Sequence, residues 1–511
     1  MAISYSVGFD LNHDGDFIDS NEALDADVFA ARWWLGMEAP FEKVPGLSGA
    51  EITLRNTGAY SPESSSIAYL PGCRVRIQSD DGTVRTHFTG IAAGIETDTD
   101  ETGRNLAVLR CVGIERELME HTGQIALQVA VTADAVIEAL INAVVGRHAV
   151  QDDYIILDRG TIGQKLFGSP WSMSFETGKS TFAYVGDLWD EERNTWELIS
   201  EVAASECGRF FVTRAGQFVF YNRHHTIEDF SNDATIANDM RKIEYSYGAE
   251  VVNKIGVRVV PREVGAANGV VWELETPQKV HWGEAGIRQI EAKFRGDNDQ
   301  SIGAVKVYAP RAGVDYTATE DRAGLGADYS AYLTVVLVKN LGKSALLELR
   351  NGTFINHLFK RDLYLQSGAV LRGQALIPGD PVRVEYRDQS SVTDYGLRAL
   401  EVEAALIDDT GHADQLARHM VGQQKTAVGV VRWLEVDTIS HPTQALARTL
   451  FDQVTVTDTA KGHSALYSIV REEHEVTGQK HKVRWLLCPS DSGKFFVLDR
   501  HKLDGAQVLA Y

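Results

Sequence analysis

The sequence predicts a mainly β protein with several domains and α+β insertions. Its 511 residues exceed one ordinary domain, and a prior of roughly 150 residues per domain gives three or four. Short runs in which apolar and polar residues alternate recur between turn residues, as in "CRVRIQ" at 73–78. Such runs are typical of half-buried strands. Apolar residues at helical spacing, in contrast, are confined to a few stretches.

The order of these patterns divides the chain into four expected domains. They are a β-barrel-like domain at 1–118, an α+β domain at 119–244, a second β domain at 245–430, and a C-terminal β unit with a tail at 431–511. Apolar stripes predict helices at 132–146 and 411–423, which would begin the second domain and close the third. A helix followed by a hairpin is expected at 194–222, because Asn194 and Glu197 have capping-box spacing and "RAG" supplies a turn.

Composition narrows the classes of function. A formal charge of -21 would repel nucleic acid and anionic lipid, and no basic patch offsets it. No signal peptide or long apolar run is visible, so we expect no membrane insertion and a start in the cytoplasm. The cysteines are far apart, which favours buried free thiols over disulfides or metal; they are Cys73, Cys111, Cys207 and Cys488.

The stretch "DLNHDGDFIDSNE" at 10–22 is a candidate calcium loop. Its oxygen-bearing side chains and one glycine follow the first half of an EF-hand loop, but position twelve is Asn21 rather than a bidentate carboxylate. Two interpretations stay open: a looser calcium site, or a solvated turn in which Asn and Asp side chains bond their own backbone. The candidate ligands are Asp10, Asn12, Asp14, Asp16 and Glu22, with Asp19 as a further oxygen donor.

Catalytic signatures are absent from the sequence. There is no Gly-rich phosphate loop, HExxH or GxSxG motif, so we expect no enzyme and no required cofactor. His224 and His225 are interpreted as part of an extended surface turn, where neighbouring side chains point to opposite faces. Cys207 is interpreted as core because no Cys–His context surrounds it. For Trp33 and Trp34 we expect one ring in the core and the other toward a neighbouring chain.

Ordered segments along the chain resemble the tail-tip and baseplate hub proteins of bacteriophages and prophages. The segments run from the Asp-rich stretch at 10–22 through "LRNTGAYSPE", "PGCRVRIQ", "FTGIAAGIE", "WELISEVAASECGRFFVTRAGQFVFYNR" and "VVNKIGVRVVPREVG". They continue with "GVDYTATEDRAGLGADYSAYLTVVL", "YGLRALEVEAALIDDTGHADQLARHMV" and "VLDRHKLDGAQVLAY". The resemblance covers most of the chain and rests on the order of the segments.

The resemblance implies a hub with two related small β-barrel domains, related to contractile-tail hubs and the spike base of type VI secretion. "AEITLRNTGAY" at 50–60 and "ALLELRNGTF" at 345–354 are compatible with such a duplication. It further implies a homotrimer in the virion tail, assembled in the host cytoplasm. The trimer would join the tail tube and distal tail proteins to tip or fibre proteins, while DNA passes through without specific binding.

Two alternatives from other classes remain. The first is a tail-associated peptidoglycan hydrolase, since related tail proteins carry such domains, although the chain shows no lytic residues. The second is a calcium-dependent adhesin or carbohydrate-binding protein, which would use the Asp-rich loop together with Trp33 and Trp34.

Overall fold

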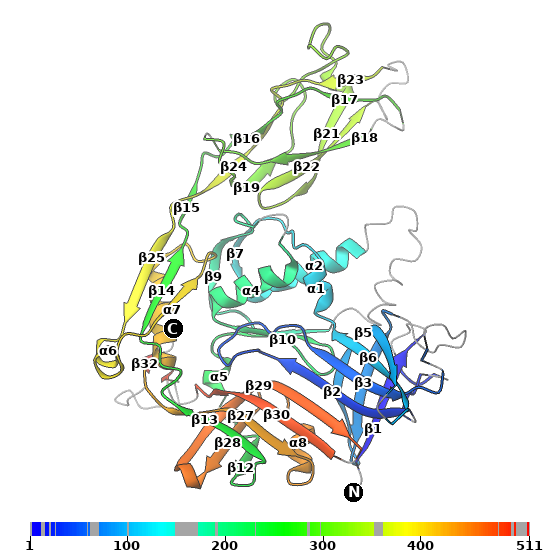
Figure 1. Cartoon of the computed structure of the whole chain (residues 1–511). Coiled ribbons are helices and arrows are strands. Elements are labelled where there is room, and N and C mark those ends of the chain that lie inside the picture. The colour runs from blue at the N-terminus through cyan, green and yellow to red at the C-terminus, as the bar shows by residue number, and fades with distance from the viewer. Residues whose placement is uncertain are drawn as a thin grey trace.

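The protein is built from one large sheet, an α+β layer beside it, and two smaller groups of strands (Figure 1). The computed structural model describes residues 3–11, 16–19, 22–25, 27–58, 60–61, 71–99, 102–148, 172–189, 193–229, 231–283, 287–296, 298–351, 361–478, 480–491, 495–496 and 508–509. In Figure 1 the large sheet lies at the bottom, the helices of the α+β layer lie above it, and the strands of residues 262–378 lie at the top.

The large sheet combines strands from both ends of the chain. Within the described residues it has twelve strands, ten of them on one path. Along that path the strands are β1 (Ser4–Asp10), β4 (Arg74–Asp80), β5 (Val84–Thr99), β6 (Asn105–Gly113), β3 (Gly49–Arg55), β2 (Val28–Gly36), β29 (His463–Thr477), β30 (Lys480–Pro489), β27 (Gly429–Asp437) and β13 (Lys242–Tyr247). Strand β28 (Gln453–Asp458) pairs with β29, and β12 (Ala234–Ala237) pairs with β28.

Alternation along these strands gives the sheet its core. In β4, Val75 and Ile77 are buried at 0% and 1% exposure while the residues between them face outward, as the period of two requires. The sheet curls so that strands distant along the path come together. The hydroxyl of Tyr5 on β1 lies 2.8 Å from Nδ1 of His481 on β30. Near the sheet lie the short helices α1 (Arg116–Glu120), α8 (Pro442–Ala447) and η2 (Thr459–Lys461).

The α+β layer packs its helices and a hairpin around one apolar cluster. Helix α4 begins after Asn194, whose side-chain oxygen accepts a hydrogen bond from the Glu197 amide at 2.8 Å. It ends at Cys207, which takes the left-handed conformation with φ 60°. The elements are β7 (Gln128–Thr132), α2 (Ala133–His148), β8 (Met173–Phe175), β9 (Thr181–Val185), α4 (Thr195–Glu206), β10 (Arg209–Val212), β11 (Phe218–Tyr221) and α5 (His225–Glu228).

The remaining strands form a small sheet covered by a helix and a distal unit at residues 262–378. The small sheet consists of β25 (Val382–Arg387), β14 (Lys254–Val259) and β26 (Ala399–Glu403), with α7 (Thr410–Gln424) packed on β14 and β25 and α6 (Gln389–Tyr395) nearby. The distal unit contains β15 (Arg262–Val264), β16 (Gly269–Glu273), β17 (Gln278–Val280), β18 (Ile287–Lys293), β19 (Gly303–Tyr308), β20 (Ala318–Thr319), η1 (Ser330–Tyr332), β21 (Leu333–Asn340), β22 (Ser344–Asn351), β23 (Leu363–Leu365) and β24 (Val370–Pro378). A pair of two-residue strands, β31 (Phe495–Phe496) and β32 (Val508–Leu509), completes the described chain.

The predicted fold class is confirmed: the protein is mainly β, with α+β insertions and several sheets. The helices expected at 132–146 and 411–423 are α2 and α7, and the helix with hairpin expected at 194–222 is α4 with β10 and β11. The four domain boundaries stay a prediction, and so does closure of two related barrels.

No helix among the described residues is both long and apolar enough to cross a lipid bilayer.

Candidate functional site

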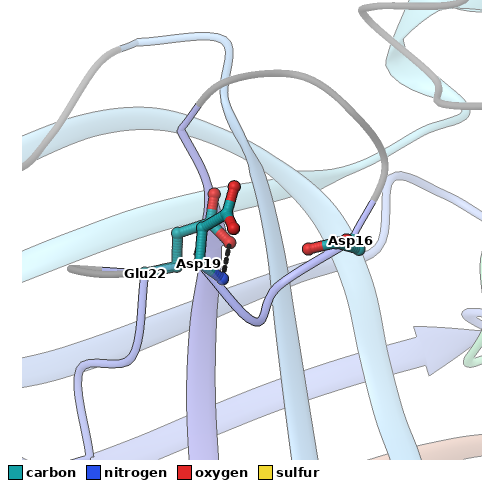
Figure 2. Close-up of side chains that lie close together, drawn as sticks. All are labelled: Asp16, Asp19 and Glu22. Atoms are coloured by element: carbon teal, nitrogen blue, oxygen red, sulfur yellow. Dashed lines mark hydrogen bonds between the residues drawn. The ribbon is translucent and has the colours of Figure 1, made fainter.

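The acidic loop brings three of its carboxylates together. Oxygen atoms of Asp16, Asp19 and Glu22 lie within 4.8 Å of one another, with Asp16 and Asp19 exposed and Glu22 buried (Figure 2). Glu22 also holds the turn, since its carboxylate accepts hydrogen bonds from the amides of Leu11 at 2.9 Å and Asp19 at 3.1 Å. The arrangement can offer hard oxygen ligands to a divalent cation, and it can equally stand as a turn stabilised by Glu22.

Of the other predicted ligands only Asp10 is described, and it is not part of this group. Asp10 is fully buried on β1, where it is paired in register with Arg74 of β4. Asn12 and Asp14 lie outside the described residues. The calcium interpretation therefore stays a prediction, with Asp16, Asp19 and Glu22 as its described ligands.

Two substitutions separate the interpretations of the acidic loop. We expect Glu22→Gln to lower the Tm equally in calcium and in chelator, because its two amide contacts need no ion and a buried hydrogen bond contributes about 1 kcal/mol. Asp16→Asn keeps an oxygen that can accept from the Ile18 amide but removes the negative charge that would bind a cation. Thermal unfolding of both variants with calcium and with chelator is the measurement. A loss confined to calcium buffer in Asp16→Asn supports a calcium site, whereas the same small loss in both buffers supports a plain turn.

Trp33 and Trp34 point to opposite faces of β2, as predicted. Trp33 is 1% exposed and stacks on His474 with ring centroids 4.8 Å apart. Trp34 is partly exposed, and its indole donates to the Leu47 carbonyl at 3.2 Å. Whether Trp34 faces a neighbouring chain stays a prediction.

Three buried histidines surround Trp33. His474 Nδ1 lies 2.9 Å from Nε2 of His481, and His87 Nε2 lies 2.7 Å from the Ser79 hydroxyl. Burial lowers the pKa of all three imidazoles far below the ordinary value, and the nearby guanidinium of Arg214 lowers each pKa further. These histidines are therefore neutral at pH 7, and we call them the histidine cluster (His87, His474, His481).

The outer face of the large sheet carries a row of alternating charges across neighbouring strands. Arg110 lies 3.0 Å from both Glu96 and Glu51, Arg32 lies 2.7 Å from Glu51, and Lys482 lies 3.5 Å from Glu475. Beside this row is a hollow of about 530 Å³ whose lining includes Arg32, Trp34, Arg471, Glu473, Lys482 and Arg484. Because these pairs are solvent-exposed they add little stability. A face with paired charges of both signs suits a solvated surface or contact with a complementary protein face.

A buried ion pair connects the hairpin to the large sheet. Arg214, in the turn between β10 and β11, donates from Nε to Glu472 of β29 at 2.7 Å. Its Nη1 donates to the Leu446 carbonyl of α8 at 2.8 Å. The Glu472 side chain is 0% exposed and that of Arg214 is 9% exposed. Arg214 thus fixes the α+β layer against the sheet.

Cys207 is a buried free thiol, as predicted, but its surroundings are more polar than the sequence indicates. Lys43 Nζ lies 3.0 Å from its sulfur and 3.3 Å from its carbonyl oxygen. Burial by itself raises the pKa of the thiol, but the ammonium of Lys43 and the nearby imidazole of His419 outweigh burial and lower the pKa to about 6. The expected absence of a histidine near Cys207 was wrong, because α7 brings His419 to it across more than 200 residues.

Replacing Lys43 tests whether its ammonium lowers the pKa of the Cys207 thiol. We expect Lys43→Met to move the Cys207 pKa from about 6 up toward or above the ordinary thiol value of about 8.5, because the compensating ammonium is gone. Thiolate absorbance followed against pH, with a Cys207→Ser variant subtracted, measures the change. Identical titration curves for wild type and Lys43→Met would contradict an ion pair between the Lys43 ammonium and the Cys207 thiolate.

His224 lies in a turn after the hairpin, as predicted, but the expectation that the pair is extended was wrong. His225 begins the short helix α5, stacks on Tyr221 with centroids 3.5 Å apart, and its Nδ1 lies 2.6 Å from Glu176. Burial, followed by the charges of Arg223 and Lys179, lowers the pKa of His224 to about 4. These contacts give the two histidines a structural role in holding α5 on the hairpin.

Comparison with known proteins gives structural matches only. No protein-family model matches the chain, and no curated protein matches it. Among solved structures, the 43 kDa tail protein of prophage MuSo2 from Shewanella oneidensis matches with 9% identity over 96% of this chain and 99% of that chain, at a TM-score of 0.49. The tail protein from Neisseria meningitidis has 8% identity over 96% of this chain and 97% of that chain, at a TM-score of 0.48.

A third structure, the prophage tail protein gp18 from Listeria monocytogenes, has 10% identity over 94% of both chains, at a TM-score of 0.41. All three structures are described as tail proteins.

Proposed function

We propose that the protein is a structural component of the tail tip or baseplate of a phage or phage-like particle, and that it assembles as a trimeric hub. In this role it joins the tail tube to distal tip or receptor-binding proteins and surrounds the channel through which DNA leaves. It needs no catalytic group and acts in the virion tail after assembly in the host cytoplasm. Calcium in the acidic loop is an optional part of the proposal.

The observation that carries the proposal is the order of the tail-like segments and their place in the fold. "LRNTGAYSPE" starts in β3, near the middle of the path of the large sheet, while "PGCRVRIQ" ends in β4 and "FTGIAAGIE" lies in β5, two strands that pair with each other. "WELISEVAASECGRFFVTRAGQFVFYNR" forms α4, β10 and β11. Several of the resembling segments therefore fall on strands and a helix of the framework of the protein.

Two further features fit assembly. Among the described residues, β13 ends the path of the large sheet on one side, so its outer edge can receive another strand or be covered by a neighbour. On the other side, residues 22–25 already bond to the outer edge of β1, since the Phe9 amide donates to the Glu22 carbonyl and the Leu24 amide donates to the Val7 carbonyl. The formal charge of -21 would repel DNA in a channel, which suits passage without binding.

Light scattering and electron-microscope class averages of the purified protein test the proposal. We expect a trimer with a central opening, and the protein in purified particles. A monomer at every concentration together with absence from particles would overturn it. Zymography on peptidoglycan distinguishes the hydrolase alternative, which predicts clearing, and glycan binding abolished by chelator would indicate the adhesin alternative.

A further inference from the structure

A pocket lies where the distal unit meets the α+β layer. Its volume is about 360 Å³. One wall comes from the α+β layer and includes Gln124, Gly186 and Trp189, and the other comes from β18 and from the turn between β21 and β22. We call it the joint pocket.

The two walls of the joint pocket are in direct contact at its rim. A Cβ atom on Gly342 would overlap the carbonyl oxygen of Gly186, and one on Gly303 would lie 2.7 Å from Cβ of Asp187. Asp187 also forms an ion pair with Arg262, at 3.0 Å, in which both side chains are at most 1% exposed. The absence of side chains on Gly342 and Gly303 is thus what permits the close approach, and the buried ion pair contributes to the stability of the closed arrangement.

The joint pocket is lined by three cations in a protein with a large excess of acids. Lys293, Arg295 and Lys343 all belong to its lining, on the side of the distal unit. The carboxylates described near the first two are at 3.8 Å: Glu291 from Lys293, and Asp299 from Arg295. The side chains of Lys293 and Arg295 are 56% and 51% exposed, so their charged ends are accessible to a dissolved ligand.

The chemistry of the lining selects an oxyanion. Lysine binds phosphate as a point charge, and arginine offers a planar fork that matches carboxylate or phosphate. Ser301 and Ser344 add hydroxyl groups to the lining. A volume of about 360 Å³ lies at the small end of ligand sites, which is enough for a compact organic or inorganic anion and far too little for a nucleic-acid duplex.

We propose that the joint pocket binds a small multivalent oxyanion, a phosphate or a polycarboxylate, and that the bound anion fastens the distal unit to the α+β layer. A ligand that contacts both walls binds only when the joint is closed, so it stabilises the closed arrangement by mass action. The pocket thereby makes the orientation of residues 262–378 depend on the anion content of the medium. This inference does not depend on the proposed assembly.

Thermal unfolding and calorimetry of the full chain in phosphate and in citrate, each against sodium chloride at the same ionic strength, test the proposal. We expect a higher Tm and measurable binding heat with at least one of the two anions. Amide hydrogen exchange at 186–189 and 341–344 should slow in the same buffer, because the joint opens less often.

Variants then assign the binding to the joint pocket. Arg295→Gln and Lys343→Gln should each weaken the affinity by about tenfold, because each removes one charge-assisted contact. Lys306→Gln is the matched control: Lys306 lies on β19 of the same unit, over the Tyr308 ring and outside the lining, and should bind as wild type does. No response beyond matched chloride, or an equal response in wild type and Arg295→Gln, would overturn the proposal. Because Arg295 is half-exposed, its variant should fold even if Lys343→Gln does not.

Discussion

Arg214→Met is expected to lower the free energy of unfolding by about 3–5 kcal/mol, the loss typical of a buried ion pair that is deprived of one partner. The substitution leaves the Glu472 carboxylate buried at 0% exposure without its guanidinium. It also removes the donors to the Leu446 and Arg448 carbonyls. Denaturant unfolding of wild type and variant measures the difference.

Two further variants make this result specific. The double variant Arg214→Met with Glu472→Leu should recover most of the loss, since apolar replacement of both partners is often neutral or stabilising. Arg383→Met breaks an exposed pair with Glu401, whose side chains are 47% and 59% exposed, and should change the free energy of unfolding little because solvent screens such a pair. A loss below about 1 kcal/mol in Arg214→Met would contradict the role given to the pair.

The second large effect is acid instability from the histidine cluster. Below pH 6.5 each of its three imidazoles takes up a proton in the unfolded chain, but not in the folded protein, where burial lowers the pKa. The unfolded state then binds more protons, so stability falls as the pH falls. With three such groups, the free energy of unfolding falls by about 4 kcal/mol for each pH unit below roughly pH 6.

Urea unfolding followed by tryptophan fluorescence at pH 7, 6 and 5 measures this slope. His87→Gln should reduce it by about one third, since one of the three titrating groups is gone. His281→Gln is the control, because the His281 side chain is 57% exposed. Equal stability at pH 7 and pH 5 would contradict the neutral buried cluster. The charges facing the cluster are Arg214, which disfavours imidazolium, and Glu472, which favours it.

Local patterns in the sequence predicted local structure well. Val75 and Ile77 could be assigned to the core because the alternation of β4 is complete within six residues. Asn194 and Glu197 could be assigned to a helix start because a cap is formed by residues three apart. The similar stretches at 50–60 and 345–354 both form central strands, β3 and β22, of their sheets.

Contacts between distant segments could not be predicted in the same way. Nothing near Cys207 in sequence indicates that Lys43 and His419 lie beside it, since both reach it only through packing of other elements. The joint pocket likewise depends on Gly342 meeting Gly186. In the acidic loop, Asp16, Asp19 and Glu22 lie together, whereas Asp10 is buried on β1 outside that group, a placement that depends on the pairing of β1 with β4.

The pairing of β2 with β29 has a consequence for synthesis of the protein. More than 400 residues separate these neighbouring strands, and at ribosomal rates of about 5–20 residues per second that length takes roughly 20 to 90 seconds to translate. Throughout that interval the edge of β2 lacks its native partner, so it is open to pairing with another nascent chain. The large sheet can therefore close only after translation of β29, which delays any surface that depends on it until the polypeptide is nearly finished.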